Sequence, residues 1–188
     1  CQDASSPHRL NVLILLNTET GVIDSYYSSS LHMPSPRLSS NLCCLQEGLF
    51  LFGGRQNPSS PLNDCWFFDF SSLQWIQLTD LPTCPSPRWS CSMVPVNAHM
   101  AVLFGGRSTT DVYGDCWSVF LKKHSTGEIE CKWSLLYDSQ NSLYNGNPSP
   151  GPCFQSIILP IIQNDLCDEI LVFSGMKNLL GESNSHIG

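Results

Sequence analysis

Short apolar runs alternate with polar turn segments along the chain, and two of these runs end in a glycine pair. The runs cover residues 49–52 and 100–104, and each is followed by Gly-Gly. Apolar runs of this length, bounded by turn residues, are typical of strands buried on both faces and are too short for helices. A glycine pair lets the chain turn with positive φ or lets a neighbouring backbone approach closely. The pattern predicts an antiparallel β-meander.

Two further strands are expected after each glycine pair. Residues 66–70 and 116–120 fit a third strand, and residues 74–78 and 132–136 fit a fourth. Aromatic and β-branched residues are common in these segments, and they favour a pleated, half-buried setting. Each glycine-marked run therefore belongs to a four-stranded unit.

The unit occurs in two full copies. Its landmarks recur 51 or 52 residues apart: Pro-Ser-Pro-Arg ends at Arg37 and Arg88, Phe-Gly-Gly-Arg ends at Arg55 and Arg107, and Asp-Cys-Trp ends at Trp66 and Trp117. Chance dipeptide matches would not keep this spacing along a whole unit. A period near 50 residues indicates stacked β-blades.

Partial copies flank the two full ones. Asn17 and Ile23 take the places of Asp69 and Trp75, and residues 170–175 repeat the end of the second strand, with serine in place of the first glycine. We therefore expect one propeller domain over residues 1–188, with the last half of a blade at 10–33, a full blade at 34–82, a full blade with a hairpin insertion at 83–147, and the first half of a blade at 148–188. The insertion covers residues 122–130 and separates Trp117 from Trp133 by 16 residues, against 9 between Trp66 and Trp75.

The order of apolar run, Gly-Gly, spacer, Asp-x-Trp, turn and Trp resembles the kelch repeat. This resemblance implies an all-β fold, a partial kelch-type β-propeller of about three blades, each with four antiparallel strands. About three blades cannot close a ring, and their outer edges would leave backbone groups unpaired. We therefore expect the chain to be a fragment with sequence missing on both sides.

Within the kelch family, the run from Phe52 to Asp69 is most similar to the C-terminal kelch region of the tRNA wybutosine-synthesising protein 4 family. The N-terminal part of those proteins resembles leucine carboxyl methyltransferases, and the family is also described as leucine carboxyl methyltransferase 2-like. This similarity implies a parent transferase that uses S-adenosylmethionine in tRNA modification. The cofactor site would lie in an N-terminal domain, so no cofactor is expected in this segment. A substrate adaptor of a ubiquitin ligase, with an upstream BTB or F-box domain, is the alternative that the kelch resemblance leaves open.

Charge limits the partners that this surface can bind. The net charge is −7, and 13% of the residues are charged, which argues against tight nonspecific binding of nucleic acid by this segment alone. Four arginines nevertheless occupy two repeat-equivalent places, and a propeller would set each pair on one face as part of a ring. We predict that a partner, either a protein or another domain of the same chain, contacts Arg37, Arg88, Trp89, Arg55 and Arg107. Through the parent protein, tRNA is a further candidate partner.

A structural role for the same residues stays open. The arginines could donate hydrogen bonds to carbonyl groups of the neighbouring blade, pair with acids such as Asp64, Asp69 and Asp115, or pack on aromatic rings. Trp66, Trp75, Trp117 and Trp133 are in phase with the repeat, so we expect them to pack between blades rather than stack on bases. Trp89 is the exception, since its place in a loop predicts exposure.

The remaining chemistry points to a binding module rather than an enzyme. Ten cysteines are present, of which Cys65 and Cys116 fit small apolar packing positions, and no Cys-x-x-Cys suggests zinc. Neither a catalytic constellation nor a phosphate loop is found in the sequence.

No glycosylation sequon with an allowed middle residue occurs, which favours a cytoplasmic protein and leaves an extracellular one as the alternative. No membrane contact is expected, because the apolar run at 13–16 is too short to span a bilayer.

Overall fold

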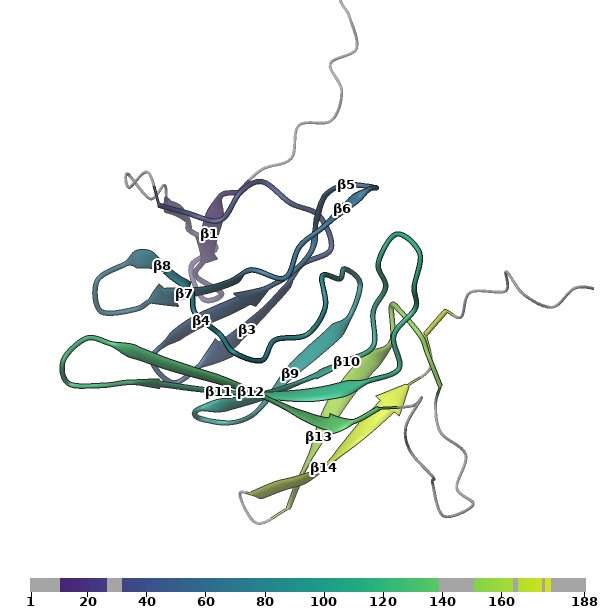
Figure 1. Ribbon diagram of the computed structural model, residues 1–188. Coiled ribbons are helices and arrows are strands. Elements are labelled where there is room, and N and C mark those ends of the chain that lie inside the picture. The colour runs from purple at the N-terminus through teal and green to yellow at the C-terminus, as the bar shows by residue number, and fades with distance from the viewer. Residues whose placement is uncertain (1–10, 27–31, 139–150, 164–165, 174, 177–188) are drawn as a thin grey trace, which may run out of the picture.

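The computed structural model describes residues 11–26, 32–138, 151–163, 166–173 and 175–176. Within these ranges the chain contains only strands and turns, with no helix. The predicted all-β fold is therefore confirmed. Figure 1 shows the sheets following one another around an arc, from β1 through the two large sheets to β14.

Two antiparallel four-stranded sheets form the two full blades. The first full blade has the order β3-β4-β7-β8, from Asn41–Leu45, Gly48–Phe52, Cys65–Asp69 and Gln74–Leu78. The second full blade consists of β9, β10, β11 and β12, from Ser92–Asn97, Met100–Phe104, Cys116–Lys123 and Ile129–Tyr137. Both sheets are meanders, because each strand pairs with the next one of its blade along the chain. The partial kelch-type propeller that the repeat predicts is confirmed.

Two-stranded sheets stand on either side of the full blades. One is the hairpin of β1 (Leu13–Leu16) and β2 (Ile23–Tyr26), and the other is the hairpin of β13 (Ile157–Gln163) and β14 (Leu166–Phe173). A small ribbon of β5 (Arg55–Asn57) and β6 (Ser60–Pro61) lies in the connection between β4 and β7.

The main core lies between the two full blades. It combines apolar side chains of both blades, namely Cys43, Leu45, Phe50, Phe52, Cys65 and Phe67 with Cys91, Ala101, Leu103, Val119, Leu121 and Trp133. The Trp133 ring centroid lies 5.9 Å from that of Phe50 and 5.1 Å from that of Phe52. The expected packing of this tryptophan between blades is confirmed, and such burial is the main source of stability in a fold of this kind.

The glycine pairs join neighbouring blades through the backbone. Gly53 and Gly54 have φ of 63° and 96°, and the amide of Gly54 donates to the carbonyl oxygen of Arg88 at 2.9 Å. A Cβ at Gly53 would lie 2.7 Å from the same oxygen. The second pair repeats this geometry, since Gly106 donates to Cys153 at 2.8 Å. Both reasons for expecting glycine, positive φ and close approach, are confirmed.

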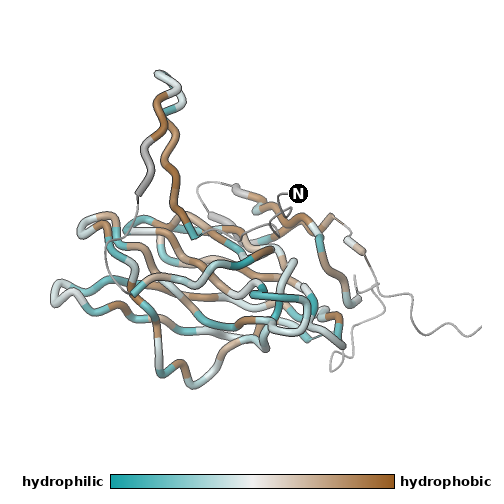
Figure 2. The backbone as a smooth tube through the Cα atoms, turned by 90° about the horizontal axis from the view of Figure 1, so that it is seen from above, coloured by the Kyte–Doolittle hydropathy of each residue, from teal (hydrophilic) through white to brown (hydrophobic). Residues whose placement is uncertain are grey.

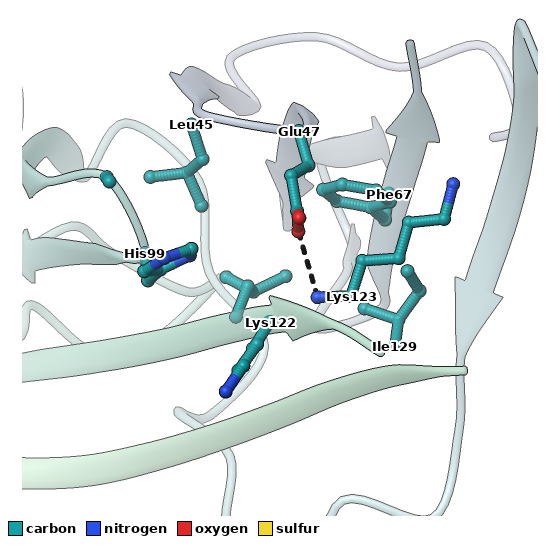
Figure 3. Close-up of a pocket in the computed structure, with 9 residues that line it drawn as sticks. Leu45, Glu47, Phe67, His99, Lys122, Lys123 and Ile129 are labelled. Atoms are coloured by element: carbon teal, nitrogen blue, oxygen red, sulfur yellow. Dashed lines mark hydrogen bonds between the residues drawn. The ribbon is translucent and has the colours of Figure 1, made fainter. Parts of the chain in front are cut away.

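The insertion in the second full blade reaches back to the first. It lengthens β11 to eight residues, against five in β7. In Figure 3 the backbone nitrogen of Lys123 points at the carboxylate of Glu47, to which it donates at 2.9 Å. The Lys123 Nζ lies 2.8 Å from the nearer carboxylate oxygen of Asp69, which ends β7 and is buried. The hairpin therefore clamps the two blades at one end.

The protonation of Asp69 is linked to this clamp. Burial alone would raise the pKa of its carboxyl, but hydrogen bonds from Lys123, Ser72 and Ser71 outweigh burial and hold that pKa well below its usual range. The ionised form is therefore the one that the fold stabilises. This stabilisation is present above the pKa of the unfolded chain, about 4, and is lost as the pH falls toward the folded pKa.

We predict that Lys123→Met lowers the free energy of unfolding at pH 7 by about 1–3 kcal/mol, because it leaves a buried carboxylate without its cation. The loss should shrink as the pH falls from about 5 to 2, where the carboxyl is protonated in the unfolded chain. Urea unfolding at a series of pH values measures both effects. Lys122→Met is the matched control, because Lys122 is exposed on the same strand. A loss that does not depend on pH would contradict the assignment.

Candidate binding surface at the inner loops

Three loops of the same shape lead into the strands that lie innermost in the blades. We call them the inner loops, residues 34–40, 85–91 and 151–156, which precede β3, β9 and β13. Each makes an antiparallel bridge to the residue that follows a glycine-marked strand, namely Leu38 with Arg55, Trp89 with Arg107 and Phe154 with Met176. Each also has one residue with φ between 53° and 56°, at Ser39, Ser90 and Gln155. The repeat therefore extends to the backbone geometry of the loops.

Arg88 lies inside the second full blade and is bound on several sides. Its side chain is 0% exposed, and its two terminal nitrogens lie 2.5 and 2.9 Å from the carboxylate oxygens of Asp115. The same guanidinium donates to the carbonyl oxygens of Ser86 and Gly105, both at 3.0 Å, and lies 4.0 Å from the ring centroid of Tyr113. A bidentate pair of this kind fixes both partners, since the fork of arginine matches a carboxylate.

Arg37 repeats the arrangement in the first full blade. It forms a bidentate pair with Asp64 at 2.6 and 2.8 Å, donates to the carbonyl of Gly53, and its side chain is 5% exposed. In both blades the same carboxylate also accepts a hydrogen bond from a tryptophan indole, Trp66 to Asp64 at 2.6 Å and Trp117 to Asp115 at 2.7 Å. The Arg, Asp and Trp of the repeat therefore form one hydrogen-bonded unit.

These contacts agree with the structural alternative for Arg37 and Arg88, with one difference from expectation. The carbonyl groups that accept from them belong to their own blade and not to a neighbouring one. Because the guanidinium groups are already paired and almost fully buried, a partner could reach little of either side chain. That these two arginines bind a partner stays a prediction, and the structure gives it little support.

Arg55 and Arg107 both lie over the Trp89 ring, in surroundings that differ from those of Arg37 and Arg88. The guanidinium carbons are 5.0 and 5.5 Å from its ring centroid, and Arg107 also lies 4.8 Å from the Phe154 centroid. Trp89 is 5% exposed, so the expectation that it would be exposed is wrong, because the two arginines and its own backbone bridge to Arg107 cover it. We call Arg55, Trp89, Arg107 and Phe154 the arginine–aromatic row.

The row differs from the buried pairs in its charge balance. Within the described ranges, neither Arg55 nor Arg107 has a carboxylate within 4.0 Å, and the Arg55 Nε is buried with no acceptor. Both side chains are partly exposed. A cation held on an aromatic face and without a counter-ion can bind an anion at small desolvation cost. Of the five predicted contact residues, Arg55, Trp89 and Arg107 lie together, and the two arginines are better placed than Arg37 and Arg88 to bind a partner.

Sequence reasoning did not single out Phe154 or Tyr113. Phe154 occupies in the third inner loop the place that Trp89 occupies in the second, so extending the repeat phase one blade further would have found it. Tyr113 lies in the connection between β10 and β11, whose length differs from that of the first full blade, and no repeat signal marks it.

The family model described as the KLHDC2/KLHL20/DRC7 Kelch-repeats domain matches residues 2–143 of the chain. The chain belongs to the kelch-repeat family. In two kelch blades of this chain, the Arg–Asp–Trp unit fixes the inner loop against its own blade, and the glycine pair joins the blade to its neighbour.

Several kelch-repeat proteins are similar to parts of the chain. tRNA wybutosine-synthesizing protein 4 of Neurospora crassa is 35% identical over 104 residues, which are 53% of this chain and 8% of that protein. Kelch domain-containing protein 2 of Bos taurus is 28% identical over 111 residues, or 58% of this chain and 27% of that protein. Dynein regulatory complex subunit 7 of Chlamydomonas reinhardtii is 35% identical over 75 residues, 35% of this chain and 6% of that protein. The predicted relation to wybutosine-synthesising proteins is confirmed, and the match spans less than a third of these relatives' own lengths.

Side chains outside the inner loops include several cysteines and other possible metal ligands. In the described part of the chain no three His, Cys, Asp or Glu side chains lie close enough together to hold a metal ion. Cys43, Cys44, Cys65, Cys84, Cys91, Cys116, Cys131 and Cys153 are free thiols. Burial raises the pKa of Cys91 to about 12 and that of Cys116 to about 11. The thiols of Cys91 and Cys116 are therefore neutral at pH 7. Among the described residues there is no helix that is long and apolar enough to cross a membrane.

Proposed function

We propose that this chain is a recognition and scaffolding module that binds an acidic segment of another protein, or of another domain of its own parent chain. A general role in protein interaction follows from membership of the kelch-repeat family. The arginine–aromatic row carries the finer proposal, because Arg55 and Arg107 hold two positive charges on one Trp89 ring without a carboxylate partner in the described ranges.

Carboxylates suit this site better than a nucleic-acid backbone does. The net charge of −7 repels a long polyanion, and the other two repeat-phase arginines are neutralised by Asp64 and Asp115. Two cations are enough for one or two carboxylates, whereas tight binding of a phosphate backbone needs several clustered ones. A partner that presents acidic side chains would reach the partly exposed guanidinium groups, which the buried Trp89 ring supports from beneath.

The double variant Arg55→Gln/Arg107→Gln tests the proposal and keeps much of the packing of both side chains. We expect it to weaken binding of a fluorescein-labelled glutamate-rich peptide by about thirtyfold, since each of the two charge-assisted hydrogen bonds contributes about 1 kcal/mol and each 1.4 kcal/mol is a factor of ten in affinity. Fluorescence anisotropy at low salt measures the change. Lys132→Gln is the matched control, because Lys132 is exposed on β12 and has no part in the row.

Equal affinity of the double variant and the control for the peptide would overturn the assignment. Total tRNA is the second probe in the same assay. If tRNA, but not the peptide, bound in a manner that depended on the two arginines, the acidic-protein proposal would be replaced by a nucleic-acid one.

For the parent protein, we propose a wybutosine-pathway transferase that uses S-adenosylmethionine and acts in the cytoplasm, with the kelch blades shaping or holding its tRNA substrate. Similarity to wybutosine-synthesising proteins of Neurospora crassa, Oryza sativa and Saccharomyces cerevisiae supports this. A leucine carboxyl methyltransferase-like domain upstream in the full reading frame, and calorimetric binding of S-adenosylmethionine by the full protein, are the expected results. An upstream BTB or F-box domain would instead favour a ubiquitin-ligase adaptor.

A further inference from the structure

The thiols of Cys65 and Cys84 meet where the first full blade joins the second inner loop. Cys65 is the first residue of β7, and Cys84 directly precedes the inner loop of residues 85–91. Both sulfurs lie within hydrogen-bond distance of one acceptor, the carbonyl oxygen of Asn63, at 3.9 Å from Cys65 and 3.6 Å from Cys84. The fold therefore brings the two thiols to one point, although β7 and β8 lie between them in the sequence.

Backbone hydrogen bonds fix the segments that carry the two thiols. The amide of Arg88 donates to the carbonyl oxygen of Leu62 at 2.9 Å, and the amide of Gly53 donates to that of Asp64 at 3.2 Å. The first bond joins the second inner loop to the connection that leads into β7, and the second bond joins this connection to the end of β4. Because the connection is tied on both sides, the two thiols stay together without a covalent bond.

The two thiols differ in their access to solvent. Cys65 is 1% exposed and belongs to the core between the blades, whereas Cys84 is partly exposed and packs against that core from outside. Figure 2 shows that hydrophobic stretches (brown) follow the strands, whereas hydrophilic stretches (teal) gather at the turns. A small oxidant in solution can therefore reach the Cys84 sulfur, and it can act on Cys65 only through Cys84.

The surroundings of the two thiols also separate their ionisation. The pKa of the Cys84 thiol is lowered by its hydrogen bond with Cys65 and by the positive charge of Arg88, which together outweigh burial and the charge of Asp64. The pKa of the Cys65 thiol is raised by the same hydrogen bond and by burial. Cys84 therefore ionises first, and Cys65 keeps its proton and donates it to the Cys84 sulfur. Partial exposure and a lowered pKa are typical of reactive cysteines.

The side chain of Trp133 favours an attack by the Cys65 sulfur. Its indole Nε1 is buried and has no hydrogen-bond partner in the part of the chain that the structure describes. Against the larger effects of Cys84 and burial, which raise the pKa of the Cys65 thiol, the N–H of Trp133 lowers it. A thiolate formed at Cys65 gives this N–H the acceptor that it lacks.

We propose that Cys65 and Cys84 form a reversible disulfide when the protein meets a hydroperoxide. The Cys84 thiolate attacks one oxygen of hydrogen peroxide, the O–O bond breaks, and the hydroxide that leaves takes up the proton released by Cys84. The sulfur is thereby oxidised to a sulfenic acid and the peroxide is reduced to water. The Cys65 sulfur then attacks the Cys84 sulfur, an S–S bond replaces the S–O bond, and hydroxide leaves with the Cys65 proton as a second water.

The disulfide joins the start of β7 to the inner loop that carries Trp89. It closes a loop that contains β7 and β8, which restricts the unfolded chain and stabilises the junction of the two blades. In the reduced protein the same junction is held by hydrogen bonds and packing alone. A dithiol such as dithiothreitol restores this state by thiol–disulfide exchange.

Mass spectrometry of tryptic peptides tests the proposal, on the protein with any sequence that flanks the 188 residues kept in place. One tryptic peptide, residues 56–88, contains Cys65 and Cys84 and no other cysteine. After excess hydrogen peroxide, we expect this peptide to lose two hydrogens and to resist iodoacetamide until dithiothreitol is added. Cleavage by chymotrypsin between the two cysteines should then leave two fragments joined by the disulfide.

Alkylation of the reduced protein tests which sulfur reacts first. At pH 7, iodoacetamide should modify Cys84 at least about tenfold faster than Cys116, because burial raises the pKa of the Cys116 thiol to about 11 and leaves little thiolate there. Equal rates would contradict the assignment of Cys84 as the attacking thiol.

Cys65→Ala removes the second thiol and keeps a small apolar side chain. In this variant we expect Cys84 to stop at the sulfenic acid, which dimedone traps, whereas the wild type gives little dimedone adduct. Cys116→Ala is the matched control, since Cys116 takes the equivalent place in the second full blade, and it should form the disulfide as the wild type does. Circular dichroism checks the fold of both variants, and the wild-type peptide map decides the question without either.

Two results would overturn the proposal. One is a peptide 56–88 that keeps both thiols free under peroxide, and the other is a bond from Cys84 to Cys131, which would join two different tryptic peptides. Neither result bears on the binding of acidic peptides, because no residue of the arginine–aromatic row takes part in the disulfide.

Discussion

Trp133→Ala is expected to lower the free energy of unfolding by about 3–5 kcal/mol, the usual cost of truncating a large buried aromatic side chain. Trp133 is 3% exposed and joins the two full blades through its contacts with Phe50 and Phe52. Because domains are stable by only about 5–15 kcal/mol, this is a large fraction of the total. The midpoint of guanidinium unfolding, with the slope held constant, measures the loss.

Two variants at the same strand separate packing from other effects. Lys132→Ala changes an exposed neighbour and should stay within about 0.5 kcal/mol of the wild type. Trp133→Phe keeps an aromatic ring and should cost less than the alanine variant. A small loss for Trp133→Ala would show that the two blades are not held together at this contact.

Arg88→Met is expected to destabilise the chain by about 3–5 kcal/mol, because it leaves the carboxylate of Asp115 partly buried without its bidentate partner. Arg88 is 0% exposed, whereas Arg37 and its partner Asp64 are 5% and 24% exposed. Arg37→Met should therefore cost less than Arg88→Met. Thermal and chemical unfolding of the two variants compare them directly.

The double variant Arg88→Met/Asp115→Leu identifies the origin of the loss. Removing both charges should restore part of the stability, since an apolar pair replaces an unpaired buried charge. If the double variant is as unstable as the sum of the two single variants, the arginine and the aspartate are not energetically coupled.

The sequence predicted those parts of the fold in which the same residue types recur at the same position of both repeats. Trp133 and Trp75 recur at equivalent places, and both are buried against other rings. The innermost strands β3 and β9 were not predicted, because no glycine pair or other repeated motif marks them and β9 includes Pro95. Such strands become visible only through their pairing with β4 and β10.

The roles of the arginines could not be predicted to the same depth. Repeat phase shows that Arg37 and Arg88 are equivalent, but it does not show that their guanidinium groups turn inward to Asp64 and Asp115. The ion pair of Lys123 with Asp69 could not be predicted from the repeat at all. Its partners are 54 residues apart, and Lys123 lies in an insertion that the other full blade lacks. Contacts of this kind depend on tertiary structure rather than on local pattern.

Scalar couplings across hydrogen bonds, measured by NMR on the perdeuterated chain, test most directly the claim that two repeats of about 51 residues fold as equivalent neighbouring blades. We predict a coupling from the amide nitrogen of Gly54 to the carbonyl carbon of Arg88, and the same coupling from Gly106 to Cys153, since these bonds are 2.9 and 2.8 Å long. Couplings from either glycine to a carbonyl three or four residues earlier, as in a helix, would contradict the account.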